Sequence, residues 1–501
     1  MCIRGKLLTT KEAKNTHQQI KLYIYHLFIA TMTAKKFINQ VSLLFILNLV
    51  VKLVWVFFVE RNIQLKVGFA QYGMYYSIFS FTLVLSVIAD PGLSNFMMKR
   101  MGDDKTENRH FSFLSLKLIL SLAYLIFTIS TAYLLNYAHQ QLLWVLVAYQ
   151  ILWSFLIYLR SYLKINQLFF LDAFISVLDK FLLVLVLIPV LAFADDFSWT
   201  TLFYAYSQLI TLLIALMVCL IVLYRNKIEV FKSFKLKVDL TLLKPLMPFA
   251  IFSFLVLALQ KIDSLMLEKL ALNGAVETGI YGAAYRFLEA ATMLPILFAT
   301  FFYPLMVNLL AQQKKFNHLV NNGLKLLGAF SIVIALATWF YQTELITLFY
   351  GNQQHQNLDL VFGLLMFTVF FQSVYYVYSS VFTANNNLKL LCYISLAGLG
   401  VNIIANIILI PLYSAVGAAI SNLLGFGVMA LIYVISYHIK FNFKIAYSIW
   451  FKFLVLILTL CTSRLFLDQL SLNWILHLLL FLTVGLFTAF LLKLLSIKDF
   501  S

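Results

Sequence analysis

Charged residues, cysteine and histidine are all scarce in this 501-residue chain. Only 11% of the residues are charged, whereas 62% are hydrophobic and 48 are phenylalanine. Mean hydropathy is +0.91. This composition excludes a set of ordinary soluble domains. Runs of about 20 apolar residues recur between residues 41 and 496, and each can cross a hydrocarbon core of roughly 30 Å as a helix. The chain is therefore predicted to be a polytopic membrane protein.

The small number of cysteines and histidines excludes several classes of site. Of the four cysteines, Cys219, Cys392 and Cys461 lie within or at the ends of apolar runs, and Cys2 lies near the N-terminus. No disulfide framework or CxxC metal motif is therefore expected. The eight histidines are scattered along the chain. Neither a zinc site nor any other bound cofactor is predicted.

The apolar runs predict an all-α fold of about fourteen transmembrane helices. Segments such as LVLVLIPVLAF (183–193) are continuously apolar, whereas a barrel strand would alternate in polarity. The predicted spans are residues 41–59, 68–89, 112–135, 142–160, 170–193, 200–224, 245–270, 279–310, 323–350, 359–384, 390–411, 415–437, 447–467 and 474–496.

Acidic residues are fewer than basic ones, 20 against 37. Lys and Arg precede the first span and follow the even-numbered spans, whereas the odd-numbered spans are followed only by Arg61, Lys66, Lys269 and Arg464. The positive charge therefore follows membrane topology and predicts that both termini are cytoplasmic. Nucleic acid is not expected as a partner.

The first 40 residues form a basic N-terminal tail that resembles neither a clean signal peptide nor a domain. A short apolar run, LYIYHLFIA (22–30), is followed by no convincing cleavage site. The preferred interpretation is a start-site extension, with Met32 as the working beginning. The alternative is an interfacial amphipathic helix on the inner leaflet.

A sequence repeat divides the spans into two lobes. QYGMYYSIFS (71–80), which opens the second span, matches IYGAAYRFLE (280–289), which opens the eighth. We refer to these two segments as the first and second Tyr-Gly motifs. They predict two six-helix lobes in a parallel pseudo-twofold arrangement, which is a transporter architecture. The domains are then 41–224 (N-lobe), 225–244 (basic cytoplasmic linker), 245–437 (C-lobe) and 438–501 (two further spans and the C-terminal tail), after the tail 1–40.

Three stretches carry a resemblance to a known family: YGMYYSIFSFTLVLSVIADPGL (72–93), the region from LMPFAIFSF (246–254) through TGIYGAAYRFLEAATMLPILFATFFYP (278–304), and VNIIANIILIPLYSAVGAAISN (401–422). In order and spacing they resemble O-antigen (Wzx-type) flippases of the multidrug/oligosaccharidyl-lipid/polysaccharide (MOP) exporter superfamily. The resemblance implies alternating access in a bacterial inner membrane. It also implies that an oligosaccharide linked to undecaprenyl pyrophosphate moves from the cytoplasmic to the periplasmic leaflet. Membrane lipids and other polysaccharide assembly proteins would be its partners.

A few charged residues interrupt the predicted spans and are the candidate site residues. A charge near the bilayer centre costs about 2.5–3.5 kcal/mol, so such residues face a protein or water-filled interior. Arg286, Lys52 and Lys261 are the candidate substrate-binding cations, suited to a pyrophosphate group. Glu289, three residues after Arg286, and Asp263 are their candidate charge partners. A purely structural pairing within the membrane is the alternative interpretation for Arg286 and Glu289.

Asp263, Asn402 and Asn406 form a candidate cation site, since they resemble a sodium site of some superfamily members. Sodium or a proton would then be the coupling ion, although an amide at Asn406 replaces the family's carboxylate and would weaken the binding of a hard cation. A structural hydrogen-bonded group of helices is the alternative.

Two other functions are compatible with fourteen spans. A multidrug or toxin antiporter of the same superfamily would favour an acidic or aromatic lumen. A membrane polysaccharide polymerase would need a sizeable periplasmic loop, and no such loop is present in the predicted topology. A transporter, not an enzyme, is therefore the main prediction.

Overall fold

The computed structural model describes residues 48–101, 110–135, 137, 139–193, 197–228, 230, 243–312, 316–351, 355, 357–444 and 446–495. Within these ranges the chain is helical and contains no strand. The all-α fold predicted from the apolar runs is confirmed. The N-terminal tail 1–40 and most of the predicted linker 225–244 lie outside the described residues.

The first half of the chain begins with helical residues 48–54, which continue into a π-helix, η1, and then into α3. Helices α4, α5 and α6 follow, with a short 3₁₀ turn, η2, after α4, and α7, α8 and α9 complete this half. Their bounds are η1 Trp55–Glu60, α3 Arg61–Val67, α4 Phe69–Leu85, η2 Ser86–Ile88, α5 Leu93–Met101, α6 His110–Leu134, α7 Gln140–Ile165, α8 Phe169–Phe193 and α9 Thr201–Arg225.

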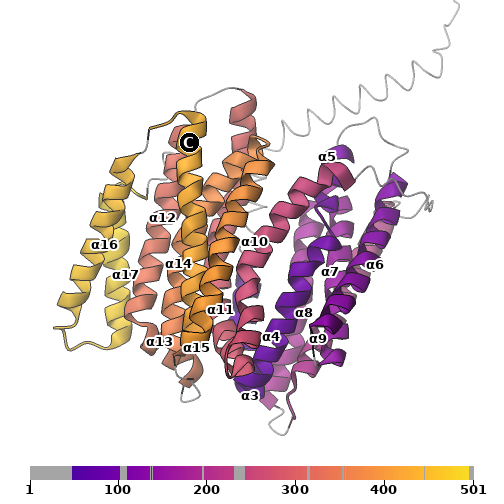
Figure 1. Ribbon diagram of the computed structural model, residues 1–501, viewed down its shortest axis with the longest axis horizontal. Helices are drawn as coiled ribbons and strands as arrows, with labels where there is room; N and C mark the ends of the chain where they lie inside the picture. Colours follow the sequence, from indigo (N-terminus) through magenta and orange to yellow (C-terminus); the bar gives the residue numbers. More distant parts are fainter. Residues whose placement is uncertain are drawn as a thin grey trace, which may run out of the picture.

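The second half contains helices α10 to α17. Their bounds are α10 Leu243–Leu270, α11 Gly274–Ala311, α12 Asn317–Phe340, α13 Gln342–Tyr350, α14 Leu358–Ala384, α15 Leu388–Phe441, α16 Tyr447–Leu467 and α17 Trp474–Leu491. Helices α16 and α17 pair with each other and pack on α12. They form one edge of the molecule, drawn in yellow in Figure 1.

Twelve helices of the described chain are long and apolar enough to cross a membrane. The longest, α15, contains two spans, because Ser414 has the non-helical angles φ 49° and ψ −125° after Pro411. Its arms fold back on each other: a Cβ added to Gly425 would lie 2.8 Å from Cβ of Asn402. The spans predicted at 390–411 and 415–437 are thus the two arms. The span predicted at 41–59 is only partly described.

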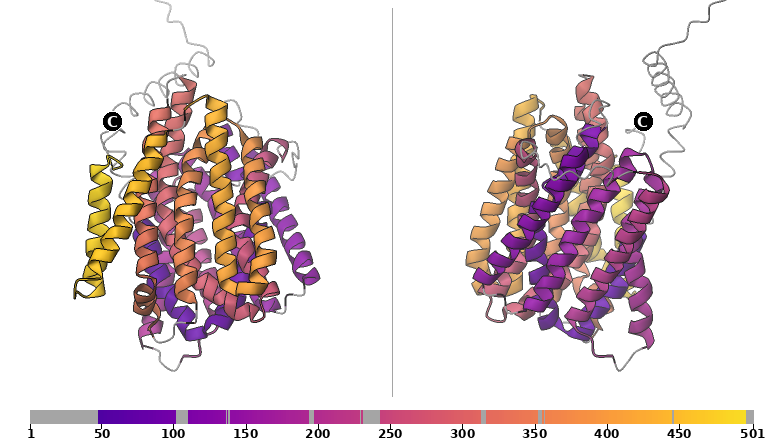
Figure 2. Two further views of the ribbon diagram at one scale, coloured as in Figure 1. Left: turned by 60° about the vertical axis from the view of Figure 1, so that its left-hand side comes forward. Right: turned by 90° about the vertical axis from the view of Figure 1, so that its right-hand side faces the viewer.

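Three clusters of buried apolar residues hold the helices together. One lies mostly among α5, α7 and α9, and a second mostly among α10, α12, α14, α15 and α16. The third joins the two halves of the chain and contains Tyr72 and Tyr76 of α4 with Tyr281 and Tyr285 of α11. Figure 1 shows the two groups of helices side by side, and Figure 2 shows them from two other directions. Helix α4 of the first half packs against α10 and α11 of the second.

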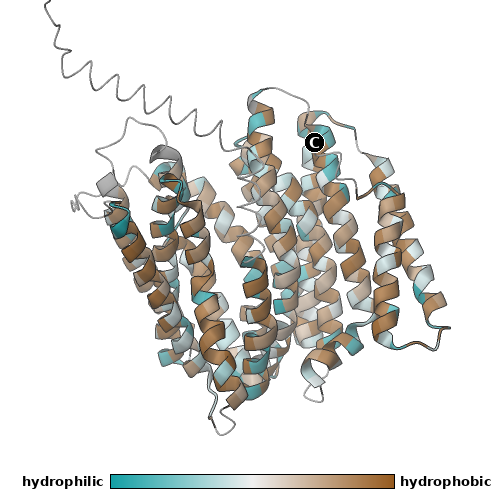
Figure 3. Ribbon diagram, turned by 180° about the vertical axis from the view of Figure 1, so that it is seen from behind, coloured by the Kyte–Doolittle hydropathy of each residue, from teal (hydrophilic) through white to brown (hydrophobic). Residues whose placement is uncertain are grey.

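Apolar side chains also cover the outside of the helices. Large hydrophobic residues such as Leu122, Ile221 and Phe451 are more than half exposed. Figure 3 shows hydrophobic residues along most of the length of the helices. Such a surface is suited to lipid tails and not to water.

The two Tyr-Gly motifs pack directly against each other. A Cβ on Gly73 would lie 1.8 Å from the backbone oxygen of Ala275, and a Cβ on Gly279 would lie 2.0 Å from that of Phe69. Gly282 is in contact with the Tyr76 ring, since a Cβ there would lie 2.9 Å from it. Glycine therefore allows the backbones of α4 and α11 to touch, as small residues do between membrane helices.

Candidate functional site

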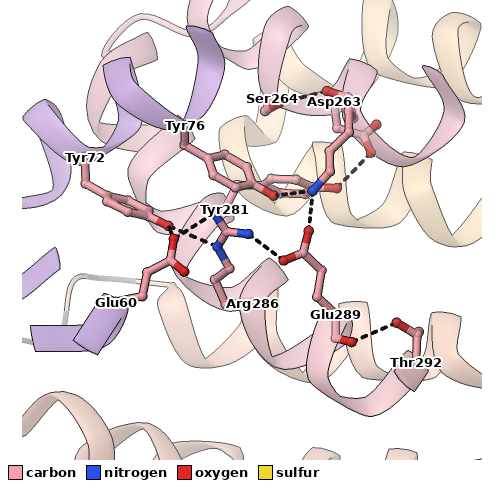
Figure 4. Close-up of polar contacts among 10 residues, drawn as sticks. Glu60, Tyr72, Tyr76, Asp263, Ser264, Tyr281, Arg286, Glu289 and Thr292 are labelled. Carbon is pink, nitrogen blue, oxygen red and sulfur yellow. Dashed lines mark hydrogen bonds and ion pairs between the residues drawn. The ribbon is translucent and has the colours of Figure 1, made fainter. Parts of the chain in front are cut away.

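Arg286 of α11 is the centre of an ionic cluster between the two halves of the chain. Its Nη2 atom lies 2.7 Å from Oε1 of Glu60, at the end of η1, and its Nη1 atom lies 2.6 Å from Oε2 of Glu289. Nε donates to the Tyr72 hydroxyl at 3.2 Å, and the guanidinium lies over the Tyr76 ring. Figure 4 shows the guanidinium between the two carboxylates.

Lys261 of α10 shares Glu289 with Arg286. Its ammonium group pairs with Oε1 of Glu289, donates to the Tyr76 hydroxyl at 3.2 Å and lies 4.4 Å from the centre of the Tyr285 ring. The Arg286 and Lys261 side chains are 5% and 4% exposed, whereas that of Glu289 is 29% exposed. Glu289 is therefore the accessible member of this group, and both cations reach solvent mainly through it.

Lys52 is placed differently from the other two candidate cations. Its side chain is exposed, and it forms no ion pair or hydrogen bond within the described residues. It lies one turn after Asn48, whose side-chain amide donates to the Ser176 hydroxyl on α8 at 3.0 Å, one turn before Lys180. Because an unpaired ammonium in lipid is costly, this position indicates that Lys52 projects toward the ionic cluster and not toward the lipid tails.

Lys180 of α8 extends the cluster into the N-lobe. Its ammonium group lies 3.5 Å from Oδ2 of Asp179, 3.2 Å from the Tyr149 hydroxyl and 4.5 Å from the centre of the Trp55 ring. Arg286 lies on the same indole ring, 5.6 Å from its centre. Trp55 opens the π-helical segment, a geometry that is frequent at functional sites. The cluster thus contains four basic groups, Lys52, Lys180, Lys261 and Arg286, and three carboxylates, Glu60, Asp179 and Glu289.

Asp263 belongs to a separate network, so its assignment as a charge partner of Arg286 and Lys261 is corrected. Its Oδ1 accepts from the side-chain amides of Asn402 at 2.8 Å and Asn406 at 2.7 Å. Its Oδ2 accepts from the Tyr281 hydroxyl and the Asn422 amide, each at 2.7 Å. The reason is helical geometry: residues two apart on α10 point to opposite sides, so Lys261 faces Glu289 while Asp263 faces α15.

The structure brings together Asp263, Asn402 and Asn406, the three residues of the candidate cation site. As the side chains lie, however, amide nitrogens and a hydroxyl proton surround the carboxylate, and the buried Oδ1 atoms of Asn406 and Asn422 have no hydrogen-bond partner. A hard cation needs oxygen ligands, so it would fit only if the amides turned their oxygens inward. The described residues contain no group of three or more His, Cys, Asp or Glu side chains that could hold a metal.

Several residues of these two groups were not found from the sequence. Glu60 was missed because it lies one residue beyond the predicted end of the first span, although a single glutamate after an apolar run could have been noted. Asn422 and Tyr281 join the Asp263 network only because α15 folds back and α11 crosses α10. Lys180 was visible as an intramembrane charge, but its stacking on Trp55 depends on tertiary packing.

Comparison with protein families places the chain in a known group. The family model described as polysaccharide biosynthesis protein matches residues 37–310, more than half of the chain, and a second model, MatE, matches residues 248–408. No curated protein matches the sequence.

Solved structures share the fold at low identity. Lipid II flippase MurJ in an inward closed conformation matches with a TM-score of 0.61 and 16% identity, over 91% of this chain and 97% of that one. Vibrio cholerae MATE transporter VcmN in the bent form matches with a TM-score of 0.53 and 15% identity, over 80% of this chain and 96% of that one. A MOP superfamily transporter from Pyrococcus furiosus matches with a TM-score of 0.59 and 15% identity, over 81% of this chain and 96% of that one. That structure is described by the reverse polarity of its binding pocket. The chain belongs to the polysaccharide biosynthesis protein family, whose model covers more than half of it.

Proposed function

We propose that this protein is a flippase that moves a lipid-linked, anionic oligosaccharide across the membrane by alternating access. The substrate would be an oligosaccharide or O-antigen unit on undecaprenyl pyrophosphate, taken from the cytoplasmic to the periplasmic leaflet of a bacterial inner membrane. Support comes from the family and from one observation in particular. Lys52 is the exposed member of a cluster that has four basic groups, Lys52 included, for three carboxylates, so the site lacks an anion.

Each cation has its own place in the proposed binding step. Lys52 is free to meet a phosphate oxygen directly. Arg286 and Lys261 are buried and already paired with Glu289, so they reach a substrate only if Glu289 moves aside. The pyrophosphate would then compete with Glu289 for these two cations. A planar guanidinium and a nearby ammonium together match a phosphate group well.

Energy for transfer would come from the membrane potential. Moving one charge across 100 mV is worth about 2.3 kcal/mol, and an inside-negative potential favours the outward movement of an anionic headgroup. We retain sodium or a proton as a coupling ion at Asp263, Asn402 and Asn406 as the second possibility. The donors that surround Asp263 favour a structural hydrogen-bond role instead.

A multidrug antiporter is the alternative function, because the MatE model and several MATE structures match. Such a protein binds organic cations and would need a carboxylate open to its lumen. Glu289 is the only candidate in the described cluster with appreciable exposure, and two cations already neutralise it. A polymerase is disfavoured because the fold neighbours are a lipid II flippase and MATE transporters.

The test uses purified protein in liposomes and a fluorescent N-acetylglucosamine linked through pyrophosphate to a short prenyl chain. Transfer between leaflets is followed by chemical quenching of the outer dye. Lys52→Ala should lower the transfer rate about tenfold or more, since one charge-assisted contact is worth about 1.5–3 kcal/mol. Lys52→Arg should retain most of it.

Lys452→Ala serves as the matched control, because Lys452 is an intramembrane lysine on α16, outside the cluster. Its transfer rate should equal that of the wild type. Transfer of an organic cation in place of the labelled lipid would establish the antiporter function instead. No transfer of the probe by the wild type, or an unchanged rate in Lys52→Ala, would refute the proposal.

A further inference from the structure

A groove of about 290 Å³ lies between α11 and α14, beyond the ionic cluster. This is at the small end of ligand pockets, which begin near 300 Å³. Seven of its nine lining residues carry a hydroxyl group.

Three hydroxyl groups of the groove, those of Thr300, Ser380 and Thr383, already donate within their own helices, and Ser380 among them is buried. Ser380 donates to the backbone oxygen of Tyr376, Thr383 to that of Ser379 and Thr300 to that of Leu297, each at 2.7 Å. Because each proton is already used within its own helix, the oxygen lone pairs remain for a ligand that donates. A ligand rich in hydroxyl groups has that property, whereas a hydrocarbon chain does not.

Aromatic rings complete the lining. Tyr303 is 42% exposed and Tyr376 is partly exposed, whereas Tyr375 is buried, with its ring centre 4.7 Å from that of Tyr376. Rings that offer an apolar face beside polar groups suit the mixed surface of a sugar, which has apolar C–H faces and a polar rim. Tyrosines and small hydroxyl residues together therefore point to a saccharide and not to a lipid tail.

The groove lies along the face of α11 that also carries Glu289 of the ionic cluster. Glu289, Ile296, Thr300 and Tyr303 follow one another at spacings of seven, four and three residues, so they share one face of α11. This face runs for roughly 21 Å at about 1.5 Å per residue. Tyr285, whose ring lies under the Lys261 ammonium, precedes Glu289 by one turn of the same helix.

We propose that this groove binds the saccharide part of the substrate while the ionic cluster holds its pyrophosphate. The inference rests on the proposed function and adds a neutral, hydroxyl-recognising subsite between α11 and α14. It assigns the tyrosine-rich segment of α14 a role in substrate recognition. It also fixes the direction in which the headgroup lies, along the Glu289 face toward the C-terminal end of α11.

The experiment compares two probes on purified protein: farnesyl pyrophosphate, and the same pyrophosphate carrying one N-acetylglucosamine. The ratio of their Kd values measures what the sugar contributes. In the wild type we expect the sugar to strengthen binding about tenfold, on the order of one aromatic stack with a polar contact.

Thr300→Phe should fill the groove and bring that ratio close to one, with the Kd of farnesyl pyrophosphate changed less than about twofold. Thr462→Phe is the matched control, since Thr462 is also exposed and also donates three residues back, to Thr459. It should keep the wild-type ratio. Tyr303→Leu, which adds no bulk, should lower the ratio in part and covers the case in which Thr300→Phe fails to fold.

The outcomes separate the two proposals. If the wild type binds neither probe, the proposed function fails and the saccharide groove fails with it. If the wild type binds farnesyl pyrophosphate but the sugar adds nothing, or if Thr300→Phe leaves the ratio unchanged, only the groove is refuted. Equal weakening of both probes by Thr300→Phe would assign the groove to the lipid chain and would likewise overturn the saccharide subsite.

Discussion

The two Tyr-Gly motifs build two different carboxylate sites from matching tyrosines. In the first motif Tyr72 donates its hydroxyl to Glu60 at 2.8 Å, and in the second Tyr281 donates to Asp263 at 2.7 Å. Glu60 is then neutralised by Arg286 from the opposite half of the chain. Asp263 is instead satisfied by three asparagines of α15, all from its own half.

This difference separates a site that can respond to lobe movement from one that cannot. Pulling the two halves apart would break the contact between Glu60 and Arg286 and that between Tyr76 and Lys261, because the partners lie on different lobes. The Asp263 network would move as one body. Under the proposed mechanism the ionic cluster would therefore couple substrate binding to alternating access, whereas the Asp263 network would stabilise the second half of the chain.

Breaking the ion pair between Arg286 and Glu60 should have the largest effect on stability. Arg286→Ala leaves the fully buried Glu60 without its cation, which typically costs about 3–5 kcal/mol. We expect a clear loss in thermal unfolding temperature in detergent and no flipping. Arg464→Ala is the control, because the Arg464 and Asp468 pair is near the end of α16 with half of Asp468 exposed, and such pairs are worth about 0–1 kcal/mol.

A double variant separates stability from function. Glu60→Gln with Arg286→Ala removes the buried uncompensated charge, so most of the lost stability should return, and the two changes should be non-additive. Flipping should stay absent because the cation is still missing. A double variant that flips at the wild-type rate would show that Arg286 only neutralises Glu60 and has no part in transport.

Asp263→Asn should have a smaller effect. The substitution replaces an acceptor by a donor that faces the Tyr281 hydroxyl or an asparagine amide, and unsatisfied buried groups of this kind cost about 1–3 kcal/mol each. The unfolding temperature should fall, but the protein that remains folded should flip the labelled lipid at nearly the wild-type rate. A stable Asp263→Asn protein with no flipping would contradict the structural role and assign Asp263 to transport.

Much of the fold could be predicted because a membrane span is recognisable from the apolar composition of its own segment. The continuous apolar runs gave helices whose bounds agree with α6, α8, α9 and α17 to within a few residues, since each run needs no distant partner to be apolar. The hairpin within α15 was predicted as two spans for the same reason, because Pro411 and the residues after it interrupt the helix.

The site was only partly predictable, because the identity of a charged residue shows that it needs a partner but not which one. Arg286 and Glu289 were paired from their spacing on one helix, and that contact is present. Asp263 was predicted as a charge partner of the candidate cations, but its side chain diverges from that of Lys261 because the two are two residues apart on a helix. Glu60 and Asn422 reach the two sites only through the packing of distant helices.

The smallest expected effect is that of sodium. With the membrane potential of proteoliposomes fixed by a potassium gradient and valinomycin, replacing sodium by choline should leave the flipping rate unchanged. Both oxygens of Asp263 already accept two hydrogen bonds, so a sodium ion would have to displace amide donors and then find oxygens that now point away.

Collapsing the potential should instead slow outward transfer, because the proposed driving force acts on the charge of the headgroup. If removal of sodium lowered the flipping rate more than about threefold, and if Asp263→Asn abolished this sodium dependence, the roles assigned to the two carboxylate sites would be reversed. The Asp263 network would then be the ion site that drives transport. The ionic cluster around Arg286 would serve only to bind the substrate that this ion gradient moves.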